Sequence, residues 1–218
     1  MNDCPFIVAV EVLEPFTSRW MFYELKHLLS VVPGECIRIF NVKNDCEVSV
    51  LREYFGYVTR ESVKDYDALR EYDEVIVLDP QATTPLSPVD FVGKVFLVVG
   101  GIMGSHPPSG RTRRELTSKL PLGEARNIGP GQFTIDGAVY VASEVYRGLR
   151  IDEVPTVDGL TLRGKGFEVF LPYRYPLKSG APFISEEEKK YILEELEEDE
   201  YLFIAEGVPP SICAHPHR

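Results

Sequence analysis

The chain has 218 residues, of which 44% are apolar and 26% charged, the composition of a globular domain long enough to bury a core. Its formal net charge is −11, and residues 185–200 alone carry −7 of that total. An acidic chain repels phosphate backbones and attracts basic surfaces, which disfavours nucleic acid as a general partner. No apolar run approaches the roughly 20 residues that a membrane span needs, so no membrane partner is expected. The N-terminus has no basic region, and no signal peptide is predicted.

The cysteines are scattered along the chain, at Cys4, Cys36, Cys46 and Cys213, and none forms a C-x-x-C pair. This spacing predicts neither a zinc site nor a disulfide framework. The histidines of the C-terminal AHPHR segment are more typical of a frayed terminus than of a metal site, so no metal is expected. The expected location is the reducing cytoplasm.

Strand-like and helix-like patterns alternate through the first 150 residues. In chain order, they predict a strand over 6–13, a helix over 17–32 that Thr17 caps, a strand over 36–42, and helical stretches over 47–55 and 60–72. Further strands are expected over 74–78, 94–99 and 124–128, with helices over 110–120 and 135–149, the last capped by Thr134.

This alternation predicts an α/β fold with a mainly parallel sheet. After residue 160 the pattern changes to a strand over 167–175, a helix that begins at Ser185 with Glu188 completing a capping box, and a short strand over 201–204. We therefore expect one domain over 1–218, made of a core over 1–150 and a C-terminal extension over 151–218 that holds a strand and an acidic helix.

Two glycine-rich segments fall where strands should end, VVGGIMGSHPP over 98–108 and ARNIGPGQFTIDGAV over 125–139. Glycine has no Cβ, so such turns let backbone groups approach a ligand, and in parallel sheets ligands bind beyond the carboxyl ends of the strands. A dinucleotide fingerprint is disfavoured because His106-Pro107-Pro108 stands where the helix should begin, and no Lys-Ser/Thr pair marks a phosphate loop. The segments predict a small-molecule pocket built mostly of backbone.

These segments belong to a longer series of motifs, EVLEPFTSRW, VVGGIMGSHPPSGRT, ARNIGPGQFTIDGAV, IDEVPTVDGLTL and FLPYRYP. Together they resemble the SPOUT-superfamily methyltransferases of the yeast ribosomal-protein arginine methyltransferase family and its archaeal relatives. The match runs over residues 11–183 in the same order. Two positions depart from the family pattern, Ser105 in place of an acid and Gly137 in place of a threonine, and they bear on substrate contacts more than on the cofactor.

The resemblance implies a trefoil-knotted α/β fold that binds S-adenosylmethionine within the knot, with adenine met by backbone groups and apolar side chains. The implied cofactor contacts are Leu78, Asp79, Pro80, Val99, Gly100, Gly101, Ile102, Gly104, His106, Asn127, Ile128, Gly129, Gln132, Phe133 and Thr134. The implied acceptor is an arginine of a basic protein, such as a ribosomal protein. The alternatives are a SPOUT methyltransferase acting on rRNA or tRNA, and a non-catalytic nucleotide-binding module.

An arginine acceptor is cationic, so a carboxylate has to hold it and orient a nitrogen toward the methyl group. Glu11, Glu14 and Asp136 are the candidates at the right edge of the sheet. Each has a structural alternative: Glu14 as a solvated loop acid, Asp136 as an acid that stabilises the first turn of a helix, and Glu11 as a charge held within a strand.

Basic residues at the start of the 110–120 helix, Arg111, Arg113 and Arg114, predict either an anion site or a solvated surface. His106 fits a hydrogen bond within the turn as well as a base. SPOUT proteins are usually dimers, but here the extension is expected to cover the dimer face. A monomer is favoured over a homodimer, and the acidic helix is expected to attract a basic substrate.

Overall fold

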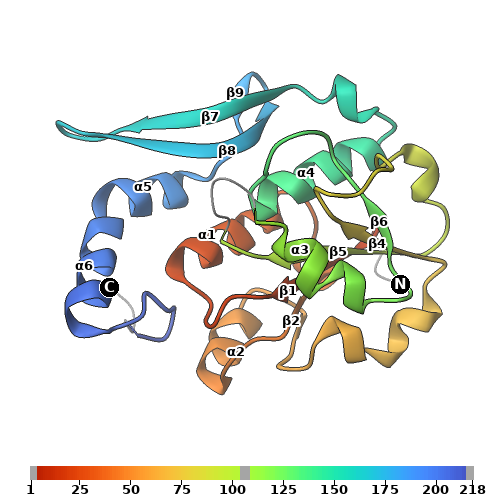
Figure 1. The fold of residues 1–218 in the computed structure, drawn as a ribbon, viewed down its shortest axis with the longest axis horizontal. Coiled ribbons are helices and arrows are strands. Elements are labelled where there is room, and N and C mark those ends of the chain that lie inside the picture. The colour runs from red at the N-terminus through yellow and green to blue at the C-terminus, as the bar shows by residue number, and fades with distance from the viewer. Residues whose placement is uncertain (1–3, 104–108, 215–218) are drawn as a thin grey trace.

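The computed structural model describes residues 4–103 and 109–214. Its centre is a six-stranded sheet of order β3-β2-β1-β5-β4-β6 in which every pairing is parallel (Figure 1). The strands are β1 (Ile7–Val12), β2 (Ile37–Phe40), β3 (Tyr57–Val58), β4 (Glu74–Leu78), β5 (Val95–Gly101) and β6 (Glu124–Arg126). The predicted α/β class with a mainly parallel sheet is confirmed. The knot stays a prediction.

The inner strands read as apolar runs because both faces of the sheet are covered. Successive side chains of β1 point to opposite faces, so Val8 and Val10 join one buried cluster while Ala9 joins the other. The same alternation sends the Glu11 side chain to the face of Ala9, whereas Val99 at the end of β5 belongs to the cluster of Val8 and Val10. The face of the sheet on which a residue lies therefore decides which site it can reach.

The helices of the core are α1 (Arg19–His27), α2 (Asp45–Arg52), α3 (Arg111–Glu115) and α4 (Ile135–Tyr146). Thr134 caps α4 as predicted, whereas Ser18 caps α1 in place of Thr17, because the Thr17 hydroxyl donates to Glu47. The stretches expected to be helical over 60–72 and 110–120 hold only short segments, the 3₁₀ turns Val63–Asp65 and Asp67–Glu71 and the five-residue α3. The remaining 3₁₀ turns are Leu28–Ser30, Gly34–Cys36, Pro88–Asp90, Thr117–Lys119 and Ile151–Glu153.

The C-terminal extension is an antiparallel sheet of β7 (Thr156–Arg163), β8 (Glu168–Lys178) and β9 (Ala181–Pro182), followed by α5 (Glu186–Glu194) and α6 (Leu196–Glu206). The strand expected over 201–204 is wrong, because these residues continue α6. The β7–β8 hairpin lies over α4, and α5 packs against α1 (Figure 1). Tyr175 and Tyr191 of the extension share a buried cluster with Trp20 and Tyr23 of α1, so the extension completes the core.

Disulfides join Cys4 to Cys36 and Cys46 to Cys213, contrary to the expectation from the cysteine spacing. The partners lie 32 and 167 residues apart in sequence, so only the folded chain brings them together. The cysteines therefore do not support a reducing compartment. Within the described ranges, no helix has the length and apolarity to cross a membrane, and no group of His, Cys, Asp and Glu could hold a metal ion.

Candidate functional site

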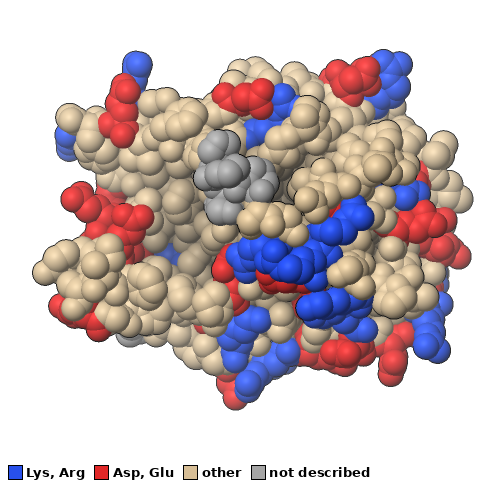
Figure 2. Space-filling model, viewed as in Figure 1, with Lys and Arg blue, Asp and Glu red and all other residues tan. Residues whose placement is uncertain are grey.

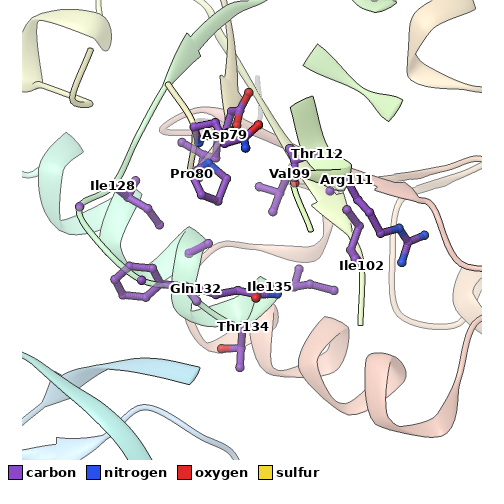
Figure 3. A pocket seen from close by; sticks show the side chains of 18 of the residues that line it. Asp79, Pro80, Val99, Ile102, Arg111, Thr112, Ile128, Gln132, Thr134 and Ile135 are labelled. Atoms are coloured by element: carbon purple, nitrogen blue, oxygen red, sulfur yellow. Dashed lines mark hydrogen bonds between the residues drawn. The ribbon is translucent and has the colours of Figure 1, made fainter. Parts of the chain in front are cut away.

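A cavity opens beyond the carboxyl ends of β4, β5 and β6, where the glycine turns were expected to meet. It encloses about 920 Å³ of empty space, open solvent at its mouth included. Figure 3 shows apolar side chains such as Val99, Ile128 and Ile135 around the opening. Its described lining is Leu78, Asp79, Pro80, Gln81, Val99, Gly100, Ile102, Ser109, Gly110, Arg111, Thr112, Ile128, Gly129, Gly131, Gln132, Phe133, Thr134, Ile135 and Ala138.

Asp79 fixes the loop that follows β4. Its buried carboxylate accepts hydrogen bonds from the Gln81 amide at 2.8 Å, from Arg113 Nε at 2.6 Å and from the Thr117 hydroxyl at 2.8 Å. One carboxylate thus joins the loop after β4 to the α3 region, on two sides of the cavity. Asp79 lines the cavity, but its oxygens already serve the protein.

The two glycines at the end of β5 have different surroundings. Gly100 lines the cavity, and a Cβ added there would meet Ile102 Cδ1 at 3.3 Å. A Cβ on Gly101 would meet the Glu11 carbonyl oxygen and Val10 Cγ1, both at 3.1 Å. Gly100 therefore keeps the cavity open, whereas Gly101 allows β5 to pack closely against β1.

The second glycine turn follows β6. Gly129 and Gly131 have φ values of +98° and +89°, a left-handed conformation that other residues rarely adopt. The Asn127 side chain shapes this turn, because its oxygen accepts the Gly129 amide at 3.1 Å and its nitrogen donates to the Ala82 carbonyl at 3.0 Å. Asn127 thus ties the two cavity loops together from outside the cavity.

Most of the expected cofactor contacts lie on the cavity wall. These are Leu78, Asp79, Pro80, Val99, Gly100, Ile102, Ile128, Gly129, Gln132, Phe133 and Thr134. Gly101 and Asn127 border the turns without lining the cavity, and Gly104 and His106 lie outside the described residues. The wall also holds residues that sequence reasoning did not single out, namely Gln81, Ser109, Gly110, Thr112, Ile135 and Ala138.

Lys and Arg side chains gather over α3, beside the cavity (Figure 2). Arg111 donates to Glu14 at 2.7 Å and to the Leu13 carbonyl at 3.0 Å, and its guanidinium points away from the centre of the cavity (Figure 3). Arg113 is bonded to Asp79 and Arg114 to Glu115. Each of these arginines therefore has a carboxylate partner within the protein.

Two of the three candidate carboxylates, Glu11 and Glu14, hold loops in place. Glu11 is fully buried and accepts the Ser62 hydroxyl at 2.6 Å and the Val63 amide at 2.9 Å, and burial raises the pKa of its carboxyl. Glu14 accepts the Met103 amide at 2.9 Å besides its bond to Arg111. Neither residue lines the cavity.

Asp136, the third candidate, lies in an acidic cluster that we define as Glu24, Asp136 and Glu188. These side chains come from α1, α4 and α5 and are at most 3% exposed. Glu24 accepts the Ile135 amide at 2.8 Å, and Glu188 accepts Trp20 Nε1 at 3.0 Å. Asp136 Oδ2 lies 2.6 Å from His27 Nδ1.

The acidic cluster brings three carboxyls of like charge together in the protein interior. Burial, reinforced by the neighbouring Asp136, raises the pKa of Glu24 to about 8, and the same causes raise the pKa of Glu188 well above its usual value. Asp136 Oδ1, Glu188 Oε2 and the Tyr175 hydroxyl are buried without a hydrogen-bond partner among the described residues. Such atoms are costly unless a donor reaches them.

Sequence reasoning missed Glu24 and gave Glu188 another role. Glu24 falls on the apolar face of α1, between Met21 and Leu25, where a charge is a signal that could have been noticed. Glu188 was assigned to a capping box, but only half of it forms: its amide donates to Ser185 Oγ while its side chain accepts from Trp20.

Comparison with known proteins shows the family of the chain. The profile of the family described as protein arginine N-methyltransferase SFM1-like matches residues 7–199. The protein arginine N-methyltransferase SFM1 of Saccharomyces cerevisiae is 28% identical over 191 residues, covering 81% of this chain and 89% of the yeast protein.

Solved structures of the yeast arginine methyltransferase SFM1 have the same fold. The structure complexed with SAM has a TM-score of 0.77 at 25% identity, covering 87% of this chain and 91% of its own. The structure complexed with SAH has a TM-score of 0.74 at 25% identity, covering 85% and 94%. The resemblance drawn from the motifs is confirmed, and the chain belongs to the SFM1-like family of protein arginine N-methyltransferases.

Proposed function

We propose that this protein transfers the methyl group of S-adenosylmethionine to an arginine side chain of a basic protein, with the cofactor in the cavity between the glycine turns. The observation that carries the proposal is the position of this cavity beside buried carboxylates, in a chain of the SFM1-like family. The relatives of known structure were complexed with SAM and SAH.

The cavity wall suits a nucleoside better than a free phosphate. Leu78, Val99 and Ile128 offer apolar surface for adenine, and the glycine turns offer backbone groups for its polar edge. Within the described lining, Asp79 and Arg111 are the charged residues, and both are bonded to other protein groups. When bound, the cofactor would supply an electrophilic sulfonium methyl group, and its transfer to nitrogen displaces one guanidinium proton.

Of the three candidate carboxylates, we assign the catalytic role to Asp136. Its Oδ1 has no hydrogen-bond partner among the described residues, whereas Glu11 and Glu14 are bonded to loop amides. Asp136 directly follows Thr134 and Ile135 in the sequence. Those two residues line the cavity, whereas Asp136 does not. There its carboxylate would hold the guanidinium and accept the displaced proton.

A basic substrate is favoured by the charge of the extension. A group of acidic side chains lies at the α5 side of the molecule in Figure 2, and the first turns of α5 and α6 are acidic. The arginines of α3 are already bonded to carboxylates, so they offer little to an RNA backbone. The ribosomal nature of the acceptor is part of this proposal, and the cytoplasm as the location follows from that acceptor and not from the cysteines.

The extension also supports a monomer as the working form. The β8 strand packs on α4 and α5 packs on α1, which fits an extension that takes the place of a second subunit. Light scattering at low and moderate salt should give one monomeric mass. A dimer that persists under both conditions would contradict the monomer.

The activity is tested by incubating the protein with S-adenosylmethionine labelled in its methyl group and an extract of basic proteins and RNA. We expect protease to release the label and ribonuclease to leave it in place. Hydrolysis of the labelled product should yield methylarginine. Label released by ribonuclease would replace the proposal with an RNA methyltransferase. No label transfer, in a preparation that binds the cofactor by calorimetry, would leave a non-catalytic binding module.

A further inference from the structure

We propose that Glu24, Asp136 and Glu188 together bind the guanidinium of the acceptor arginine, so that α5 of the C-terminal extension supplies part of the acceptor site. This inference rests on the proposed arginine methylation and adds two residues to Asp136. It also gives the extension a role in acceptor binding besides that of covering the core.

The acidic cluster has the acceptors that a guanidinium needs. A guanidinium carries five N–H donors in a plane and no acceptor. The cluster presents two carboxylate oxygens without partners, Asp136 Oδ1 and Glu188 Oε2, and beside them the unpartnered hydroxyl of Tyr175. These three residues are at most 1% exposed, so the atoms face the protein interior and not solvent.

Within the described part of the chain, no lysine or arginine forms a salt bridge with the acidic cluster, and Lys189 acts on Glu188 only at longer range. The basic group in direct contact is His27, whose Nδ1 lies 2.6 Å from Asp136 Oδ2. Buried carboxylates without cations are rare because desolvation penalises their charge. An arriving guanidinium would supply the missing positive charge, which is the situation in which a buried ion pair is strongest.

The groups around the acidic cluster fit a planar cation as well. Trp20 of α1 and Tyr173 and Tyr175 of β8 lie beside its carboxyls. The Trp20 indole is fixed by its bond to Glu188, and Tyr173 interacts electrostatically with Glu24 and Glu188. Aromatic faces beside carboxylates favour guanidinium over a compact ammonium ion.

The acidic cluster also adjoins the cofactor cavity through the first turn of α4. The Ile135 amide donates to Glu24 while Ile135 itself lines the cavity. The two sites are thus separated by the chain segment that carries Thr134 and Ile135. An arginine that reached Asp136 from the extension side would bring its terminal nitrogens toward the cofactor side of that segment.

Proton linkage makes guanidinium binding at the acidic cluster depend on pH. Because burial raises the pKa of Glu24 to about 8, the free protein holds a proton on Glu24 at neutral pH, and burial raises the pKa of Glu188 as well. A guanidinium binds the ionised carboxylates, so its binding releases protons and tightens as pH rises toward about 8. The groups that face these carboxyls are His27, Asp136, Trp20, Lys189, and the phenols of Tyr173 and Tyr175, whose pKa values are raised.

The test uses Trp20, the single tryptophan of the chain, as a fluorescent reporter beside Glu188. The full chain, saturated with S-adenosylhomocysteine, is titrated with Nα-acetylarginine methylamide and, separately, with the lysine analogue. We expect saturable binding of the arginine probe alone, weakened about tenfold or more in Glu188→Gln. Glu194→Gln, an exposed position on the same helix, should bind as the parent does.

A glutamine at 188 resembles the protonated acid, so the variant should fold, which thermal unfolding by circular dichroism checks. Tyr175→Phe removes an unpartnered hydroxyl and serves as a second variant, with an expected weakening of about threefold. Equal affinity for the arginine probe in the parent and in both variants would overturn the acceptor site, as would equal affinity for the lysine analogue. Failure to bind S-adenosylhomocysteine by calorimetry would instead overturn the proposed function.

Discussion

The cofactor cavity and the acidic cluster lie on two sides of the first turn of α4, and their side chains differ in polarity and charge. The cavity is lined by apolar side chains and glycine backbone, and its charged residues, Asp79 and Arg111, are bonded to protein groups outside the lining. The acidic cluster holds three buried carboxyls, and two of them have an oxygen without a hydrogen-bond partner among the described residues. The difference indicates that one side is preorganised for a ligand, while the other is incomplete until a cation arrives.

The largest expected effect separates catalysis from cofactor binding at Asp136. Asp136→Asn keeps the shape of the side chain and removes its charge, so methyl transfer to arginine should fall about 100- to 1000-fold. Affinity for S-adenosylhomocysteine should change less than about twofold, since Asp136 does not line the cavity. Single-turnover kinetics and calorimetry give the two numbers.

Asp45→Asn is the matched control, because Asp45 also lies in the first turn of a helix but is exposed and paired with Arg60. If Asp136 only stabilised its helix, the two variants would lose similar stability and neither would lose turnover. Normal turnover in folded Asp136→Asn would remove the carboxylate from the mechanism.

The two glycines at the end of β5 test the cavity side. A side chain on Gly100 projects beside Ile102 and Thr112 at the cavity wall, so Gly100→Val should weaken S-adenosylhomocysteine binding about 30-fold or more. A side chain on Gly101 meets the backbone of β1, so Gly101→Val should chiefly lower the melting temperature. The reverse pattern, with Gly100→Val unfolded and Gly101→Val folded but unable to bind, would show that the cofactor does not bind in this cavity.

The cavity side could be predicted from the sequence because its signals are local. A strand followed by glycines predicts a turn at one edge of a parallel sheet, and such turns follow β5 and β6. The Asp79-Pro80 loop follows β4 at the same edge. The residues that tie the turns together, such as Asn127 and Asp79, act through contacts 34 to 45 residues away that no local pattern records.

The acidic cluster could not be predicted because its members lie more than 50 residues apart and meet only after α5 packs on α1. The disulfide between Cys46 and Cys213 escaped prediction for the same reason. The strand expected over 201–204 has a local cause. Its apolar run Tyr-Leu-Phe-Ile fits a strand or a helix alike, and the acids that precede it favour a helix N-terminus.

The smallest expected effect is the pH dependence of the free energy of unfolding that Glu24 produces. Glu24 has a folded-state pKa of about 8 against 4.5 as its usual value, so the folded chain binds more protons than the unfolded chain between these values. Its contribution to the free energy of unfolding should fall, by on the order of 2 kcal/mol, as pH rises from about 5 to about 8.

Glu24→Gln stays neutral and can still accept the Ile135 amide, so this variant should lose less stability over that range and exceed the parent at pH 9. Urea unfolding at pH 6 and pH 9 measures the difference. A parent chain that becomes more stable as pH rises to 8, by an amount that Glu24→Gln removes, would reverse the sign assigned to this group.

The most direct test of the account asks whether the cavity and the acidic cluster are two halves of one site. A bisubstrate ligand that carries a guanidine tethered to the sulfur position of S-adenosylhomocysteine would span the first turn of α4. Calorimetry should show it binding the parent chain about 100-fold more tightly than S-adenosylhomocysteine, with most of that gain lost in Asp136→Asn and Glu188→Gln. A ligand that binds no more tightly than S-adenosylhomocysteine, or a gain that both variants retain, would contradict the account.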